Sequence, residues 1–329
     1  MSKLRLSFGC WNYDRTRSLL EGRTQPDGID LNYLNMPVEE TFFRMLRNRE
    51  FDVAEMSLSS YTVSLFKDSP FIAIPIFPSR FFRHSCIYVN ANSGIKEPKD
   101  LIGKRIGNPE YQMTAPVWIR GVLSDEYGVP VNSVTYYTGG EEEPNRSEKL
   151  KLDLPADIKV QPIGPTQTLS AMLATGEIDA LYTARMPSSF HTSGGKVKRL
   201  FEDFVPVEQD YFRRTGIFPI MHTVVIRREV YEQNRWIAQS LYKAFCEAQQ
   251  ETYKDLYETA ALKTMLPWLT AHVEEARREM GDDFWPYGFE KNKQTLSTFL
   301  RYSFEQGLSK HLLTPEQLFA PETLESFKI

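Results

Sequence analysis

The chain has 329 residues, of which 41% are hydrophobic and 25% are charged, and its formal net charge is −4. At roughly 150 residues per domain this length predicts about two domains, and the composition is that of a globular protein rather than a disordered or fibrous one. A nucleic-acid surface normally needs an excess of basic residues, so that class is disfavoured, whereas a small anionic ligand remains compatible with this charge.

Cysteine usage favours a reducing compartment. The three cysteines, Cys10, Cys86 and Cys246, are far apart and form no C-x-x-C pair, which excludes a disulfide framework and a zinc knuckle. The first residues lack the apolar run of a secretory signal, and the most apolar stretch, 71–77, is too short to span a bilayer. We therefore expect a soluble, cytoplasmic protein.

Strands alternate with helices along the first part of the chain. Strands are expected at 4–8, 29–34, 52–55, 71–77, 85–90 and 134–137, and helices at 38–47, from Ser57 onward, and at 114–127. Such alternation predicts βαβ units and a mostly parallel sheet. The charged stretch 139–155 predicts an exposed excursion, a further strand is expected at 218–227, and the rest is expected to be helical, with a loop at 285–288 packed on the core.

A short internal similarity links two predicted helix-to-strand junctions. A single constant shift along the chain aligns identical residues of the two junctions. Thr41, Met45, Leu46, Glu50 and Asp52 of the first align with Thr168, Met172, Leu173, Glu177 and Asp179 of the second. Any junction of this kind favours the same pattern, so coincidence is one interpretation. The other is that two similarly built lobes each carry one copy, each followed by serines.

Common catalytic motifs are missing from the sequence. It contains no phosphate-binding loop, no G-x-G-x-x-G and no G-x-S-x-G nucleophile elbow. None of the five histidines lie at H-x-H or H-x-x-x-H spacing, so a metal site would have to be assembled from distant residues. Candidate functional groups must therefore be sought at strand ends.

Polar residues gather at several predicted strand ends. Arg80, Arg83 and His84 are embedded in aromatic sequence, which favours a ligand role over a surface loop. A helix begins near Thr114, and its free N–H groups suit an anion, although an ordinary N-cap explains the same residues. His222 lies within an apolar strand, where a hydrogen-bonded core histidine is the alternative.

Five long segments, spread over nearly the whole chain, carry a family resemblance. They are Phe51–Tyr61, Ile74–His84, Pro109–Gly121, Gly216–Arg228 and Asp283–Gly288. Together they resemble the 4,5-dihydroxyphthalate decarboxylase family, which is similar in fold to type II periplasmic solute-binding proteins. The resemblance implies two α/β lobes joined by two crossing strands, here expected at 85–90 and 218–227, with the ligand in the cleft between them. We accordingly expect lobe I over 1–84, lobe II over 85–222, and a return to lobe I with C-terminal helices over 223–329.

The resemblance implies decarboxylation of a hydroxylated aromatic dicarboxylate, with 4,5-dihydroxyphthalate giving protocatechuate. Because the ionised hydroxyl of such a substrate drives the reaction, we expect no cofactor, and the missing histidine spacing favours activity without a metal, although a metal held by distant residues stays open. The partner would be this small carboxylate, with no nucleic acid or membrane and with homo-oligomerisation left open. A non-catalytic solute-binding or sensor protein for a small aromatic or anionic ligand is the alternative, although transport would require an export signal. The thiamine-pyrimidine synthesis proteins share the fold, but nothing specific in this sequence supports that third interpretation.

Such a reaction needs a base, an acid and a group that holds the retained carboxylate. Histidine suits proton transfer because it titrates near neutrality, and the planar fork of arginine binds two carboxylate oxygens. The catalytic candidates are therefore His84 and His222, with His191 in reserve and Glu110 as a carboxylate alternative. The expected substrate-binding residues are Asn12, Ser57, Ser59, Arg80, Arg83, Tyr111, Gln112, Thr114, Arg185 and Ser188.

Overall fold

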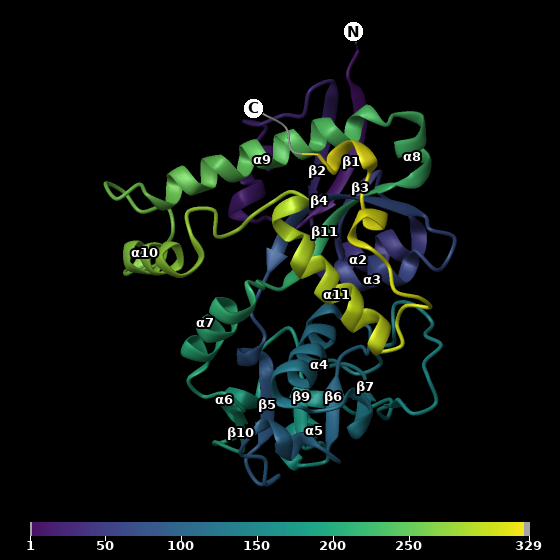
Figure 1. The fold of residues 1–329 in the computed structure, drawn as a ribbon, viewed down its shortest axis with the longest axis vertical. Coiled ribbons are helices and arrows are strands. Elements are labelled where there is room, and N and C mark those ends of the chain that lie inside the picture. The colour runs from purple at the N-terminus through teal and green to yellow at the C-terminus, as the bar shows by residue number, and fades with distance from the viewer. Residues whose placement is uncertain (1, 326–329) are drawn as a thin grey trace. The chain divides into compact units, whose positions relative to one another are not determined.

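Two compact units make up the chain in the computed structural model, which describes residues 2–325 (Figure 1). Within this range, unit 1 comprises residues 2–80, 220–296 and 314–325, and unit 2 comprises residues 81–219 and 297–313. The chain thus changes unit slightly before the boundaries expected after residues 84 and 222. Residues 297–313, expected in lobe I, pack in unit 2, because Trp118 holds Phe299 and Tyr302 with ring centroids 5.4 and 5.6 Å away.

Unit 1 is built on one mixed sheet. Its strands are β1 (Leu4–Cys10), β2 (Ile29–Asn35), β3 (Val53–Ser57), β4 (Phe71–Arg80) and β11 (Ile220–Arg227), and its helices include α1 (Arg17–Leu20), α2 (Val38–Asn48), α3 (Leu58–Ser64), α8 (Arg228–Gln233), α9 (Trp236–Leu256) and α10 (Leu269–Met280). The strand order is β2-β1-β3-β11-β4. The first three strands are parallel, and β11 runs antiparallel to both β3 and β4.

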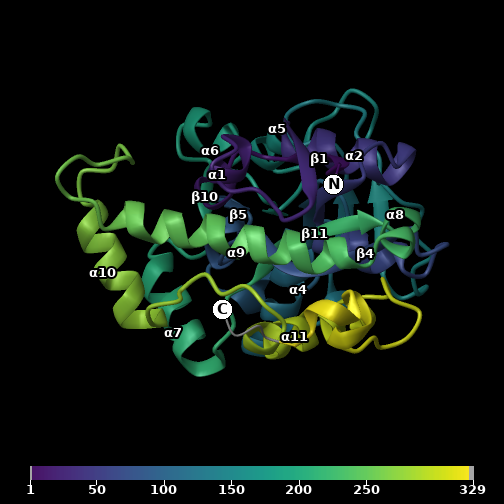
Figure 2. The same ribbon diagram turned by 90° about the horizontal axis from the view of Figure 1, so that it is seen from above.

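Helix α9 packs its apolar side on this sheet. Ala238, Leu241, Phe245 and Ala248 are buried, as their helical spacing predicts, and Phe245 meets Phe8 of β1 edge-on at 5.4 Å. Figure 2 shows α9 extending along unit 1, with α10 beyond its C-terminal end. The 285–288 loop packs on the core as expected, because Gly288 N–H donates to Pro75 O at 2.9 Å.

Unit 2 contains a second sheet with strand order β10-β5-β9-β6-β7-β8. Its elements are β5 (Ile87–Asn90), β6 (Arg105–Asn108), α4 (Thr114–Tyr127), β7 (Thr135–Thr138), β8 (Lys159–Pro162), α5 (Leu169–Thr175), β9 (Ala180–Tyr182), α6 (Ser189–Thr192), β10 (Val197–Arg199) and α7 (Phe204–Thr215). Helix α11 (Lys293–Glu305) begins in unit 1 and ends in unit 2. A core cluster that includes Tyr88, Leu173 and Leu181 covers one part of this sheet.

The crossing expected at 85–90 is wrong, because strand β5 lies wholly in unit 2. The segment 218–227 does contain a change of unit, since residues 218–219 belong to unit 2 and β11 to unit 1. Strand β4 instead continues to Arg80, which pairs with Ile220 at the start of β11. The chain then changes unit in both directions, where Phe81 N–H donates to Pro219 O at 3.1 Å. The strand pairing therefore ends where the units change.

The internal similarity has a structural counterpart in each unit. The residues that directly follow helices α2 and α5 match, since Arg49 and Gly176 both adopt the left-handed conformation. Three residues later, Asp52 accepts a hydrogen bond from Ser7 N–H of β1 at 2.8 Å, and Asp179 accepts one from Arg105 N–H of β6 at 2.9 Å. Each aspartate thus fastens the strand that follows it to the neighbouring parallel strand.

No helix within residues 2–325 has the length and apolarity needed to cross a membrane.

Candidate functional site

A buried carboxylate and an imidazole meet on adjacent strands of unit 1. Glu55 and Ser57 lie on the same side of β3 because side chains alternate along a strand. His222 of β11 pairs with Ser57, which makes it the diagonal neighbour of Glu55. His222 Nδ1 lies 2.6 Å from Glu55 Oε1. The antiparallel insertion of β11 beside β3 therefore creates a Glu55–His222 pair.

Three further donors come from the end of β1 and the loop after it. Tyr13 Oη donates to Glu55 Oε1 at 2.5 Å, and the backbone N–H of Trp11 donates to Oε2 at 3.2 Å. The Cys10 thiol also lies within hydrogen-bond range of Oε2, at 3.5 Å. Both carboxylate oxygens are thus engaged by more than one donor. The site is assembled from residues 10–13, residue 55 and residue 222.

These donors decide the charge of Glu55. Its side chain is 0% exposed, and burial opposes ionisation, but the adjacent His222 and the hydrogen bonds from His222, Tyr13 and Trp11 lower its pKa below the usual value. Burial and the nearby carboxylate raise the pKa of Tyr13, so this phenol keeps its proton. Glu55 is therefore an ionised acceptor surrounded by neutral donors and the imidazole.

The pair orients one imidazole nitrogen toward proton transfer. With the proton on Nδ1 donated to Glu55, Nε2 of His222 presents a lone pair and makes no hydrogen bond within the described residues. The His222 side chain is 17% exposed, and Phe42 packs edge-on against its ring at 4.9 Å. A carboxylate that fixes the tautomer and stabilises the imidazolium makes such a histidine an effective general base.

Other candidates from the sequence surround this pair in unit 1. Ser57 pairs with His222 and accepts a hydrogen bond from Ser60 N–H at 3.4 Å. Ser59 is buried in the first turn of α3. The amide oxygen of Asn12 is buried and has no partner among residues 2–325. The guanidinium of Arg15 lies 4.2 Å from the centre of the Tyr13 ring, which places a cation beside the pair.

Arg80 has structural partners in unit 1. Its guanidinium is 3% exposed, donates to Pro286 O at 2.7 Å and to the side chain of Asn292, and lies 5.2 Å from the centre of the Phe77 ring. These contacts tie the end of β4 to the 285–288 loop. They favour a structural role for Arg80 over the expected ligand role.

His84 lies in unit 2, in the short 3₁₀ helix His84–Cys86 rather than at the start of a strand. The rings of Tyr127, Phe201 and Tyr211 surround it, with centroids 6.1, 5.3 and 5.4 Å away. Neither imidazole nitrogen has a hydrogen-bond partner among the described residues, and burial lowers the pKa of His84 to about 4. This aromatic cage favours a packing role for a neutral imidazole.

The remaining candidates of unit 2 occupy three places. Arg83 is buried, donates toward Ala184 O at 3.4 Å and lies over the Phe81 ring, whereas Arg185 is exposed just after β9. Ser188 binds the carboxylate of Glu142 through its N–H and hydroxyl, at 2.7 and 2.6 Å. His191 is exposed in α6 and packs against Phe190 at 5.1 Å.

The start of α4 holds the last group of candidates. Tyr111 and Gln112 are buried just before α4, and Thr114 is its first residue. Glu110 is 0% exposed and is paired with Arg146 at 2.6 Å and with Lys149. The excursion 139–155 was expected to be exposed, but it is partly buried because Lys149 must reach this carboxylate.

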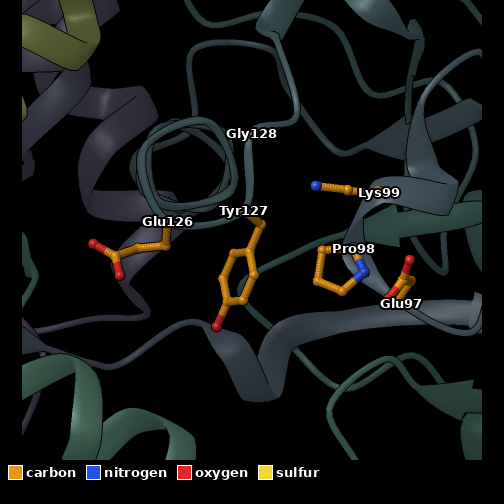
Figure 3. Close-up of a pocket in the computed structure, with 6 residues that line it drawn as sticks. All are labelled: Glu97, Pro98, Lys99, Glu126, Tyr127 and Gly128. Atoms are coloured by element: carbon orange, nitrogen blue, oxygen red, sulfur yellow. The ribbon is translucent and has the colours of Figure 1, made fainter.

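A surface pocket of about 440 Å³ lies at the other end of α4 (Figure 3). Glu97, Pro98, Lys99, Glu126, Tyr127 and Gly128 line it. Figure 3 shows Glu126 pointing away from Pro98 and Lys99, and Glu126 pairs instead with Arg214 at 2.5 Å. The charged side chains do not converge there.

No group of three or more His, Cys, Asp or Glu residues within 2–325 has the arrangement that would hold a metal ion.

Sequence reasoning named His222 as a candidate but did not name the residues found beside it, Glu55 and Tyr13, or Cys10, which contacts Glu55. One signal was available for Glu55, because an acidic residue amid Val53, Ala54 and Met56 of a buried strand needs a specific partner.

Comparison with known proteins identifies the relatives of this chain. It is 45% identical over 330 residues to 4,5-dihydroxyphthalate decarboxylase of Comamonas testosteroni, covering 100% of both chains. It is 46% identical over 214 residues to the Pseudomonas putida protein of the same name, covering 65% of this chain and 83% of that one. The chain belongs to the 4,5-dihydroxyphthalate decarboxylase family. The family resemblance seen in the sequence is thereby confirmed, and the activity that names the family is that of a carboxy-lyase. No family model matches the chain.

Solved structures confirm the fold expected for this decarboxylase family. The periplasmic aliphatic sulphonate binding protein SsuA from Escherichia coli has a TM-score of 0.54 at 16% identity, with 98% of this chain and 99% of that one covered. The ligand-binding component of an ABC-type import system from Staphylococcus aureus also has a TM-score of 0.54, at 13% identity, with 98% of both chains covered. The chain therefore has a periplasmic-binding-protein-like α/β fold.

Proposed function

We propose that this protein decarboxylates 4,5-dihydroxyphthalate to protocatechuate, with His222 as the proton-transfer residue and Glu55 as the residue that positions it. Membership of the decarboxylase family supports the reaction class and the substrate. The single observation that carries the assignment within the chain is the 2.6 Å contact between His222 Nδ1 and a fully buried, ionised Glu55.

The substrate itself supplies the electron path. Each carboxylate of 4,5-dihydroxyphthalate is para to a hydroxyl, so removing that hydroxyl proton pushes electrons toward the carbon that bears the carboxylate. Protonation of this carbon gives a dienone, and cleavage of its bond to the carboxylate releases carbon dioxide. The bonding pair returns to the ring, which recovers aromaticity as a phenolate. One proton is consumed overall and comes from the solvent.

His222 fits the hydroxyl end of this path. Nε2 accepts the hydroxyl proton, and the resulting imidazolium is stabilised by Glu55. When the ring becomes a phenolate again, the imidazolium returns the proton to it. Tyr13 and Trp11 keep Glu55 ionised through the cycle, so that the negative charge remains beside Nδ1. The positioned base contributes a factor of about 10²–10⁴ in rate, the usual range for general base catalysis.

The direct test is to incubate the purified protein with 4,5-dihydroxyphthalate and to follow carbon dioxide and protocatechuate together. We expect the two products in equal amounts. The matched control is 4-hydroxyphthalate, which keeps one hydroxyl para to only one carboxylate and should lose that carboxylate alone. A folded protein that binds 4,5-dihydroxyphthalate without releasing carbon dioxide would contradict the proposal.

A further inference from the structure

Two buried amides in unit 2 lack any hydrogen-bond partner. Asn108 is the last residue of β6, and Gln112 lies between β6 and α4. Both are 0% exposed, and neither the oxygen nor the nitrogen of either amide has a partner among residues 2–325. Buried polar groups are normally paired, since an unpaired one has given up its hydrogen bonds to water without a replacement. Such a pair of unpartnered amides beside one turn points to a polar ligand at that turn.

The same turn already binds a carboxylate. The N–H of Tyr111 donates to the Glu148 carboxylate, and the N–H of Gln112 also bonds to it. These groups directly precede α4, a helix of 14 residues whose N-terminal end favours negative charge. This turn therefore has the donors of a carboxylate-binding site, and the side chain of Glu148 occupies them.

Glu148 is weakly held in this position. Its second oxygen, Oε2, is buried without a partner in the described part of the chain. The nearby cations Arg146 and Lys149 pair with Glu110 instead. Burial and the like charge of Glu110 raise the pKa of Glu148 to about 7, while Lys149 and the two N–H groups act in the opposite direction. A carboxylate under this repulsion is easily replaced by another one.

The segment that carries Glu148 can leave without breaking secondary structure. No helix or strand occurs between the end of β7 at Thr138 and the start of β8 at Lys159. Within this segment Glu143 is exposed and its side chain makes no hydrogen bond or ion pair with the described residues, whereas Lys149 is anchored on Glu110. Release of Glu148 requires that its bonds to the N–H groups of Tyr111 and Gln112 break and that the loop beside this anchor change its conformation.

We propose that the turn before α4 is a carboxylate-binding subsite and that Glu148 occupies it until a ligand carboxylate takes its place. The incoming carboxylate binds the N–H groups of Tyr111 and Gln112, and the Asn108 and Gln112 amides donate to it. The identification of this ligand as an aromatic carboxylate rests on the proposed function. The subsite itself rests on the contacts of unit 2 alone.

The test uses the full chain and phthalate, a dicarboxylate that lacks the hydroxyl needed for turnover. Calorimetric titration at pH 8 compares the wild type with Glu148→Gln and with the loop control Glu143→Gln, which makes the same change in charge. We expect Glu148→Gln to bind phthalate about tenfold more tightly, since one competing charge is removed, and Glu143→Gln to match the wild type. At pH 6 the advantage of Glu148→Gln should shrink, because Glu148 of the wild type is then largely protonated.

A second variant and a second measurement keep the test interpretable if Glu148→Gln fails to fold. Gln112→Leu should weaken phthalate binding by about tenfold or more, with circular dichroism checking the fold. Hydrogen exchange of residues 144–150 in the wild type should rise when phthalate is added, because Glu148 is released.

Equal phthalate affinity of the wild type and Glu148→Gln would overturn the subsite. So would a failure of Glu148→Gln to bind phthalate, benzoate or succinate. The proposed function is judged separately, by carbon dioxide release from 4,5-dihydroxyphthalate. A protein without that activity whose carboxylate affinity still rises in Glu148→Gln would retain the subsite and lose only the substrate assignment.

Discussion

Glu55 and His222 are 167 positions apart in the chain, yet their side chains share a hydrogen bond of 2.6 Å between adjacent antiparallel strands. The contact needs no loop to form, since the register of β3 and β11 places the two residues diagonally on one face. A catalytic pair built on strands is held more rigidly than one built on loops. The predictions below test this pair and its surroundings.

Replacing His222 by glutamine should lower kcat by at least about 100-fold, because a positioned base is typically worth about 10²–10⁴ in rate. Substrate binding should change much less. His272→Gln is the matched control, since His272 is exposed in α10 and should tolerate the change. Steady-state kinetics with a thermal melt of each variant provide the measurement. Turnover near the wild-type value in folded His222→Gln would remove this residue from the mechanism.

Tyr13→Phe should shift the acidic limb of the pH–rate profile upward. The Tyr13 hydroxyl donates to Glu55 and lowers its pKa, so its removal raises that pKa and Glu55 becomes protonated at a higher pH. We expect a lower kcat/KM at acidic pH and recovery toward the wild-type rate at higher pH. Tyr257→Phe, on an exposed residue, serves as the control. An unchanged acidic limb would show that this hydrogen bond does not tune the pair.

The His84 cage should make the protein sensitive to acid. The pKa of His84 is about 4 in the folded state, below its usual value of 6.5. Its contribution is therefore fully present above pH 6.5 and is lost as the pH falls toward 4, by about 3 kcal/mol in total. His84→Phe, which fills the cage without a titratable group, should lose less stability over this range. Urea unfolding at pH 7 and pH 5 would measure the difference, and equal losses would contradict the prediction.

The catalytic role first expected for His84 remains a prediction that His84→Gln can test. If the imidazole transfers protons, the folded variant should lose turnover by at least about 100-fold. If it only packs against Tyr127, Phe201 and Tyr211, the variant should melt at a lower temperature while its folded fraction keeps near-normal turnover. The aromatic surroundings favour the second result.

Activity should survive treatment with a chelator. The reason is chemical, because the hydroxylated ring accepts the electrons itself and the proposed route needs no separate electron sink. We expect the same rate of protocatechuate formation before and after dialysis against EDTA. A rate that falls and is restored by one added divalent ion would refute this, and it would direct attention to ligands drawn from distant parts of the chain.

Arg185→Ala should weaken substrate binding by about tenfold to 150-fold, since charge-assisted hydrogen bonds are worth about 1.5–3 kcal/mol. Arg185 is exposed just after β9, so its removal should leave the melting temperature unchanged. Arg83→Ala should also weaken binding, but the buried position of Arg83 and its contacts with Cys86 and Ala184 add a loss of stability. Lys196→Ala, on an exposed residue, is the control. Wild-type affinity in Arg185→Ala would show that this arginine is only a surface residue.

Local elements followed directly from sequence patterns. Helix α4 begins and ends at the expected residues, Thr114 and Tyr127, because its apolar spacing and the C-capping Gly128 are local signals. The similarity between the junctions at Asp52 and Asp179 was visible in the sequence, where coincidence remained an alternative, and the structure shows that both aspartates make the same bond to a neighbouring strand. Patterns within about ten residues of sequence therefore predicted many of the local elements of the fold.

The Glu55–His222 pair was less accessible to the same reasoning. Recognition of Glu55 as the partner of His222 requires knowing that β11 lies between β3 and β4, and no local periodicity encodes that order. For His84, the neighbours in sequence and the neighbours in space point to different roles. Its arginine and phenylalanine neighbours in sequence favoured a ligand role, whereas the rings that enclose it come from α4, α7 and the segment before α7.

The position of β11 also determines when the site can exist during synthesis. Strands β3 and β4 are both made within the first 80 residues, but the strand that fills the gap between them begins only at Ile220. Until then β3 lacks the neighbour on one of its edges, β4 lacks the strand that joins it to the sheet, and Glu55 lacks its histidine. The Glu55–His222 pair can therefore form only after residues 81–219 of unit 2 have been synthesised.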